Sequence, residues 1–340
     1  MSSSVSLAAL AGICAGIACA STPTPADGPG TAWSTGAILP RAARDAGVTA
    51  LGLDVVVAGG FTQDPAAGLT VTSRVDVLDT ATGHWLPAGT LPDAPVRWTA
   101  INLAAVGATL YLLGGLDGTD RTARGEAYAL DPLDHTWQSL PALPPGYERG
   151  AAGVVVTTGR IYLLGGIAST GPVATCLEYD VPTRTWALLP SLPEPRAWPA
   201  AMRRADGTLI VAGGLASVDA SEPRGEVWSL PPPGAASRSW TPRAAMHPPG
   251  AADPGGGCAY GAVLGQLVCA GGAAAAGARA SVASYDPYND VWTVREAMPA
   301  GRAGVPGAAI GGRLYIPGGA GAQGEPTDTL YVYTPLDTQP

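Results

Sequence analysis

Short apolar runs that end in a pair of glycines recur along the whole chain. Their glycine pairs stand at Gly59-Gly60, Gly114-Gly115, Gly165-Gly166, Gly213-Gly214, Gly271-Gly272 and Gly318-Gly319. A continuous apolar run bounded by turn residues is typical of a buried β-strand. Successive pairs are 55, 51, 48, 58 and 47 residues apart. The pattern therefore predicts six copies of one all-β unit.

A polar turn followed by a tryptophan repeats with the same period. An aspartate precedes a tryptophan by six residues at Asp79 and Trp85, Asp131 and Trp137, Asp180 and Trp186, and Asp286 and Trp292. An aspartate suits the start of a turn because its carboxylate accepts backbone N–H bonds. We expect each tryptophan to open the next strand and to fill the space between neighbouring sheets. In the fourth unit Leu230-Pro231-Pro232-Pro233 replaces the aspartate turn before Trp240, which predicts a distorted outer hairpin.

The combination resembles kelch repeats, in which a glycine pair, a Tyr-Asp or similar end to the third strand and a tryptophan recur. The resemblance covers about residues 32–335 and implies an all-β, six-bladed kelch β-propeller with one four-stranded blade per repeat. The last repeat reaches its third strand at Thr329–Tyr333 but has no tryptophan after it. A matching outer strand surrounds Trp33 instead. We therefore expect the N-terminal strand to complete the last blade, which closes the ring and hides two sheet edges.

The composition agrees with many short strands and narrows the classes of partner. The chain has 47 glycines and 33 prolines, yet its hydrophobic content is 46% and its charged content only 14%. A disordered chain would show the opposite balance. The net charge of −8 argues against a general nucleic-acid binder, which needs a basic face to neutralise phosphates.

The first residues predict export. Val5–Ala20 is a run of apolar and small residues, shorter than the roughly 20 residues of a membrane-spanning helix. It ends in Ala18-Cys19-Ala20, the A-x-A pattern of a signal-peptidase site. We expect a signal peptide over residues 1–20, a Pro/Gly-rich linker over 21–31, the propeller over 32–335 and a tail over 336–340. In an alternative that stays open, Cys19 is the lipidated first residue of a lipoprotein. Both predict an extracellular or periplasmic monomer, bound to a membrane only through such an anchor.

Five arginines recur shortly before the innermost strand of their repeats. Arg41, Arg97, Arg149, Arg196 and Arg302 each stand 16 to 18 residues before the first glycine of their pair. We expect them at the mouth of the central channel, with Trp98, Tyr147 and Trp198 beside them. A guanidinium matches the geometry of a carboxylate or sulfate, so one interpretation is a site for an anionic sugar or an acidic peptide. In the other, which also stays open, the arginines tie blade to blade through backbone carbonyls.

Residues for catalysis or metal binding are sparse. His84, His135 and His247 fall in separate loops, so neither a histidine metal site nor a cofactor is expected. The sequence therefore favours an exported binding or interaction module for a protein or carbohydrate ligand. The alternative is a carbohydrate-active enzyme resembling the six-bladed kelch epimerases of sialic acid. That chemistry needs a proton donor and acceptor near a carboxylate-binding arginine, and Glu148 or Glu194 are the candidates.

Overall fold

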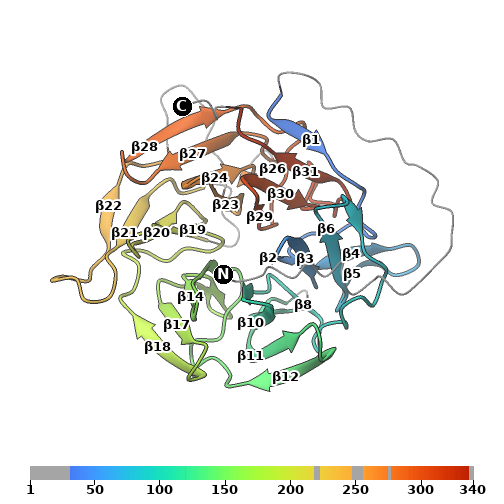
Figure 1. Ribbon diagram of the computed structural model, residues 1–340, viewed down its shortest axis with the longest axis horizontal. Coiled ribbons are helices and arrows are strands. Elements are labelled where there is room, and N and C mark those ends of the chain that lie inside the picture. Colours follow the sequence, from blue (N-terminus) through green and yellow to red (C-terminus); the bar gives the residue numbers. More distant parts are fainter. Residues whose placement is uncertain (1–30, 119, 218–222, 247–255, 275–276, 337–340) are drawn as a thin grey trace.

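Six antiparallel sheets stand around a central channel in the computed structural model of the chain (Figure 1). The structure describes residues 31–118, 120–217, 223–246, 256–274 and 277–336. The expected signal peptide, Cys19, nearly all of the linker, His247 and nearly all of the C-terminal tail lie outside these residues. Within the described ranges every regular element is a strand. They contain no helix that is long and apolar enough to cross a membrane.

The blades follow one another in chain order, each from an innermost to an outermost strand. Blade one contains β2 (Gly47–Leu51), β3 (Asp54–Ala58), β6 (Val75–Asp79) and β7 (His84–Trp85). Blade two contains β9 (Leu103–Val106), β10 (Thr109–Asp117), β11 (Thr122–Asp131) and β12 (Thr136–Leu140), with β8 (Trp98–Thr99) also paired to β10. Blade three contains β13 (Gly153–Val156), β14 (Arg160–Leu164), β17 (Cys176–Asp180) and β18 (Thr185–Leu189).

The second half of the ring repeats this order. Blade four contains β19 (Ala200–Arg203), β20 (Leu209–Ala212), β21 (Val227–Leu230) and β22 (Thr241–Arg243). Blade five contains β23 (Ala259–Val263), β24 (Gln266–Ala270), β27 (Val282–Asp286) and β28 (Val291–Arg295). Blade six contains β29 (Ala308–Ile310), β30 (Arg313–Pro317), β31 (Leu330–Tyr333) and β1 (Trp33–Thr35). The six-bladed propeller expected from the repeats is confirmed.

Short hairpins mark one of the two faces of the ring. They are β4–β5 (Phe61–Asp64 and Gly68–Val71), β15–β16 (Ile167–Ala168 and Gly171–Pro172) and β25–β26 (Ala273–Ala274 and Gly277–Ala278). Each follows a glycine pair, at the end of the second strand of its blade. We call this face the hairpin face.

The glycine pairs let neighbouring blades approach closely. Gly165 has a φ of +64°, and a Cβ at this position would lie 2.6 Å from the carbonyl oxygen of Arg196 at the entrance to the next blade. The N–H of Gly166 donates to the same carbonyl, with an N···O distance of 2.7 Å. Gly60, Gly272 and Gly319 make the equivalent bond to the next blade. A larger residue would force the blades apart, so the glycine pair is a contact between blades as well as the end of a strand.

Every repeat tryptophan hydrogen-bonds to the preceding blade. The indole N–H groups of Trp33, Trp85, Trp137, Trp186, Trp240 and Trp292 donate to the carbonyls of Glu296, Ala37, Pro92, Pro141, Pro190 and Ala244, with N···O distances of 2.8–3.3 Å. The tryptophans thus join the outer ends of neighbouring blades by a directed bond in addition to their buried surface.

The turns before these tryptophans are built as the spacing predicts. The Asp79 carboxylate accepts the N–H groups of Ala81 and Thr82, and the Asp286 carboxylate accepts those of Tyr288 and Asn289. Blade four, which lacks the aspartate, joins β21 to β22 through residues 231–240, and β22 has only three residues. The distorted outer hairpin expected there is confirmed.

The ring is closed by strands from opposite ends of the chain. Strand β1, blue in Figure 1, pairs with β31, red, so that Trp33 lies opposite Tyr333 and Thr35 opposite Tyr331. Trp33 is buried, and its ring lies 5.1 Å from the ring of Tyr333. The Glu296 carboxylate of blade five accepts the backbone N–H that precedes β1. The expected closure by the N-terminal strand is confirmed, and it covers the edge of β31.

Removing the closing strand is expected to open the ring. A chain lacking residues 1–30 should keep the unfolding free energy of the full chain, because β1 and its contacts remain. A chain lacking residues 1–40 should lose more than the about 3–5 kcal/mol typical of deleting one buried aromatic side chain, and its free β31 edge should promote self-association. Urea unfolding and light scattering after size exclusion measure both effects. A monomeric chain 41–340 of full stability would contradict the closure.

Candidate functional site

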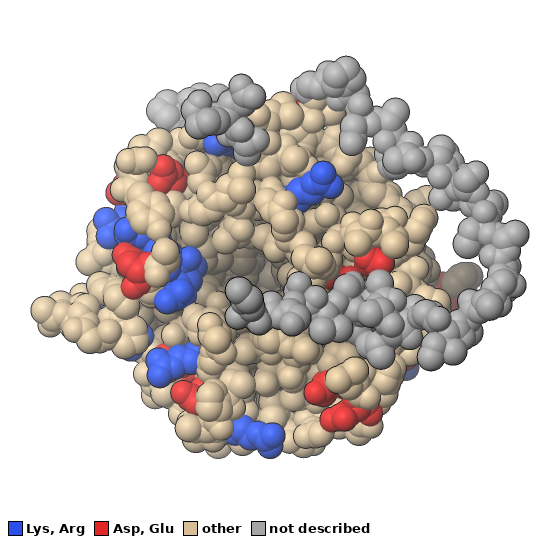
Figure 2. All heavy atoms as spheres, in the orientation of Figure 1, with Lys and Arg blue, Asp and Glu red and all other residues tan. Residues whose placement is uncertain are grey.

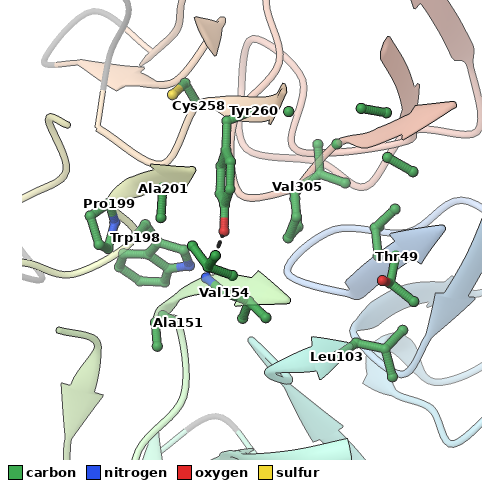
Figure 3. A pocket seen from close by; sticks show the side chains of 18 of the residues that line it. Thr49, Leu103, Ala151, Val154, Trp198, Pro199, Ala201, Cys258, Tyr260 and Val305 are labelled. Carbon is green, nitrogen blue, oxygen red and sulfur yellow. Dashed lines mark hydrogen bonds between the residues drawn. The ribbon is translucent and has the colours of Figure 1, made fainter. Parts of the chain in front are cut away.

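The innermost strands of all six blades enclose a cavity of about 430 Å³ on the ring axis. Its walls are mostly small apolar side chains, among them Val48, Ala105, Val154, Ala201 and Val305. Figure 3 shows part of this wall, with Trp198 and Tyr260 as its large aromatic side chains. The face seen in Figure 2 is hollowed at the centre, and most charged side chains on it lie toward the periphery.

A ring of six left-handed residues surrounds the cavity. Asp45, Ala100, Ala151, Trp198, Gly257 and Gly304 occupy the equivalent position in the six blades, with φ values between 46° and 69°. We call them the channel belt. Backbone N–H groups donate around the belt from Asp45 to Gly304, Ala100 to Asp45, Ala151 to Ala100, Trp198 to Ala151, and Gly304 to Gly257, with N···O distances of 2.6–3.2 Å. The belt thus joins the inner ends of the blades, as the tryptophans join their outer ends.

The belt lies at the hairpin face. The residue before each belt position pairs with the chain just after a glycine pair, as in the bridges Arg44 to Phe61, Gly150 to Ile167 and Gly256 to Ala273. These partners begin the three short hairpins. A molecule that approaches this face therefore meets the side chains of the belt before it reaches the strands of the channel wall.

Two of the six belt positions hold a large or charged side chain, while the other four hold alanine or glycine. Asp45 and Trp198 stand three positions apart in either direction around the ring of six, so they face each other across the channel. The Asp45 carboxylate is paired with Arg44 at an N···O distance of 2.8 Å, and the Arg44 guanidinium lies over the ring of Phe61. Burial raises the pKa of Asp45, while the charges of Arg44 and Arg121 oppose that rise. The Asp45 carboxylate at the mouth of the channel is thus already paired with the Arg44 cation.

Tyr260 reaches from blade five toward blade three across the cavity. Its hydroxyl oxygen accepts the N–H of Val154 in β13, at 2.9 Å, the dashed line in Figure 3. That N–H is available because β13 is an innermost strand and pairs on one side only, with β14. Burial raises the pKa of Tyr260 to about 12, so the phenol keeps its proton throughout the physiological range.

Four of the five repeat arginines point into the blades. The Arg149 side chain, 1% exposed, donates to the carbonyls of Tyr147, Gly165 and Thr175, and burial lowers its pKa to about 10. Arg41 donates to the Gly59 carbonyl and forms an ion pair with Asp76. Arg196 forms ion pairs with Glu194 and Glu226, and its guanidinium lies over the ring of Trp228. Arg302 donates to the Gly301 carbonyl, and its guanidinium lies over the ring of Tyr331.

The fifth arginine, Arg97, is exposed and donates twice to the Val71 carbonyl. None of the five lines the central cavity. Their expected place at its mouth is corrected: the belt residue, two to four positions further along the chain, stands there instead. The physical reason is that carbonyls beside the glycine pairs are buried and need donors, which the long guanidinium side chains supply.

Most of the other predicted site residues also lie outside the cavity lining. Trp198 lines the cavity. Trp98 is buried in the core between blades one and two, and Tyr147 is packed against the core between blades two and three. Glu148 accepts the N–H of Gly146, and Glu194 is held by Arg196, so both carboxylates lie outside the cavity wall. Of the predicted set, only Trp198 faces the channel.

Cysteine and histidine side chains form no metal centre in the part of the chain that the structure describes. There, no three His, Cys, Asp or Glu side chains gather closely enough to hold an ion. Cys176, Cys258 and Cys269 are buried and unpaired, and Cys258 borders the cavity next to Tyr260.

The two interpretations of the arginines predict different stabilities. Arg149→Ala should lower the free energy of unfolding by about 3 kcal/mol or more, because each buried group left without its bond costs about 1–3 kcal/mol. The matched change Arg97→Ala, at an exposed side chain, should cost less than about 1 kcal/mol. Urea unfolding measures both. Equal, small losses would contradict the structural role of Arg149.

Alkaline unfolding tests the burial of Tyr260. Because its pKa rises from 10 in the unfolded chain to about 12 in the fold, the unfolded state loses the proton first. The associated stability is complete below pH 10 and is lost as the pH rises toward 12, by at most about 1.4 kcal/mol per pH unit. Tyr260→Phe should flatten the fall in unfolding free energy between pH 10 and 12. An identical slope in both proteins would contradict the burial.

Comparison with known proteins agrees with the repeat architecture. Residues 148–193 match the family model described as Kelch motif. Kelch-like protein terF of Aspergillus terreus is 34% identical over 181 residues, which cover 48% of this chain and 38% of that protein. Kelch repeat and BTB domain-containing protein 13 of Homo sapiens is 28% identical over 141 residues, covering 41% of this chain and 29% of that protein. The chain thus spans about a third of the length of these relatives.

A solved structure shows the same fold over nearly the whole length. The structure titled "Structure of YjhT" aligns with a TM-score of 0.70 and covers 89% of this chain and 97% of that chain, at 17% sequence identity. At this identity the likeness concerns the fold alone. Six blades, six glycine pairs, the matched motif and the kelch-repeat relatives lead to one conclusion: the chain belongs to the kelch-repeat proteins.

Proposed function

We propose that this kelch-repeat interaction module binds its ligand in the central cavity, which the ligand enters through the channel belt on the hairpin face. The cavity itself carries the proposal, because it is walled by all six blades and combines apolar side chains with a few placed polar ones, among them Asp45, Arg203 and Tyr260. Ligand sites are typically concave and largely apolar, with a small number of placed polar groups. A cavity of about 430 Å³ falls in the size range of such sites.

The geometry favours an uncharged ligand over the anionic sugar or acidic peptide suggested by the arginine pattern. Arg41 and Arg196 are already neutralised by carboxylates, and Arg149 is saturated by carbonyls. Binding an anion there would require breaking these contacts and exposing buried partners. Of the five arginines, Arg97 is the exposed one, and an anionic contact is proposed only for it.

The arrangement supports a binding module more than the alternative, a carbohydrate-active enzyme. Proton exchange on a sugar needs an acid and a base within reach of one bound substrate. Glu148 and Glu194, the carboxylates proposed for that role, lie outside the cavity wall and are engaged by Gly146 and Arg196.

The proposal includes export, supported by the apolar segment and the A-x-A site of residues 1–20. The mature chain would then begin at Ser21, or at a lipidated Cys19. Intact mass spectrometry of the protein recovered from the cell envelope and the medium distinguishes the two. Recovery of the whole chain with Met1 in the cytoplasm would contradict export.

Filling the cavity tests the proposed function. Ala105 is half-buried on the cavity wall and Ala142 is exposed in a loop outside it, so Ala105→Phe has Ala142→Phe as its matched control. In a thermal-shift screen of sugars, acidic sugars, peptides and small ring compounds, a ligand at 100 times its Kd adds about 2.7 kcal/mol of stability. That gain should vanish in Ala105→Phe and persist in Ala142→Phe. A ligand that stabilises both variants equally would place binding elsewhere.

A further inference from the structure

Trp198 occupies a backbone position that is costly for a large side chain. Its φ is +46°, and its N–H donates to Ala151 as part of the channel belt. The belt bonds set this left-handed conformation whatever the side chain is. Four of the other five belt positions hold glycine or alanine. A bulky residue with positive φ is a genuine outlier, and such strain concentrates at binding sites and active sites.

The indole of Trp198 is not used in the way that the repeat tryptophans are used. Those six donate their N–H to the preceding blade. Trp198 has no hydrogen bond from its indole to any residue in the described ranges. The side chain is half-buried, packs on the small residues of the belt region and borders the cavity beside Pro199 (Figure 3).

Tyr260 supplies a hydrogen-bond donor in the same cavity. Its hydroxyl oxygen accepts the N–H of Val154, which fixes the phenol across the channel. Among the described residues none accepts the hydroxyl proton in return. Tyr260 is half-buried and lines the cavity, so an acceptor brought by a ligand would gain a hydrogen bond from its hydroxyl.

The space between these two side chains is apolar. Ala151, Val154, Pro199, Ala201 and Val305 contribute the surrounding surface (Figure 3). At the mouth opposite Trp198, Asp45 is already paired with Arg44. A ligand between these two side chains therefore meets one flat π-face and one hydroxyl donor, while the other charged residue that lines the cavity, Arg203, stands at the end of β19.

We propose that Trp198 and Tyr260 form a recognition site for an uncharged, planar ring compound with a carbonyl oxygen. The ring of the ligand stacks on the indole, and its carbonyl oxygen accepts a hydrogen bond from the Tyr260 hydroxyl. The inference rests on the proposed function and names its ligand class. A sugar could also stack on the indole, but its several hydroxyls would enter an apolar space. Each polar group buried without a partner is costly, which favours a ligand with one acceptor.

Coumarin, a neutral planar lactone, is the probe for the test, with methyl β-glucoside as the comparison ligand. Calorimetric titration of the full chain should detect coumarin binding. Trp198→Gly should weaken it about 5- to 150-fold, since stacking on an aromatic side chain is typically worth about 1–3 kcal/mol. Trp198→Phe, which keeps a ring, should stay within about fivefold of the wild type, and Tyr260→Phe should weaken binding about fivefold, the worth of one hydrogen bond. Tyr288→Phe, an exposed tyrosine outside the cavity, is the control and should change nothing.

The thermal stability of the Trp198 variants distinguishes a role in ligand recognition from a structural role of the indole. Glycine relieves the positive φ at position 198, so Trp198→Gly should melt at a higher temperature than Trp198→Ala although both lose the indole. Weaker binding by the folded glycine variant supports the inference. Equal coumarin affinity in Trp198→Gly and wild type, or no coumarin binding at millimolar concentration, overturns it. If methyl β-glucoside binds instead and Ala105→Phe abolishes that binding, the ligand class is wrong while the proposed function stands.

Discussion

The propeller depends on a ring being closed by non-covalent bonds between the two ends of the chain. Each blade packs side by side with two neighbours, and five of these six blade-to-blade contacts follow directly from chain order. The sixth requires β1 to pair with β31 and Trp33 to bond to blade five. Two concentric sets of bonds then join the blades: six indole N–H groups at the rim, and five backbone bonds of the channel belt at the centre. A gap at any point would remove a neighbour from both adjoining blades and expose their edges.

This constraint explains why the arginines became structural. Closing six blades around a narrow axis buries carbonyls beside every glycine pair, and those acceptors must be satisfied. The guanidinium of Arg149 satisfies two backbone carbonyls there together with the Thr175 hydroxyl. Four of the five repeat arginines are directed into the blades, and the charged residues that line the cavity are Asp45, paired with Arg44, and Arg203 at the end of β19. The chemistry open to a ligand is therefore set by the belt and by the aromatic side chains of the cavity.

The sequence predicts the architecture well because the repeat encodes it locally. Glycine pairs, aspartate turns and tryptophans carry short-range signals, and six copies locate the N-terminal strand in blade six. The site is less accessible to sequence. Nothing in the sequence marks Ala100 or Ala151 as left-handed, because the belt bond from the preceding blade imposes that conformation. In the sequence Tyr260 looks like any other strand residue. Its hydrogen bond to Val154, 106 positions away along the chain, joins blades five and three. The direction of the arginine side chains is likewise a tertiary property, although their recurrence already pointed to a repeat role.

Native-state hydrogen exchange of the full chain and of Trp33→Ala tests most directly whether closure at the rim maintains the central site. If closure maintains the site, loss of the Trp33 contacts should lower the protection of belt amides far from blade six, including Ala100, Ala151 and Trp198, together with those of β31. Loss of protection confined to blade six, with the belt amides of blades two to four unchanged, would show that the cavity does not depend on closure.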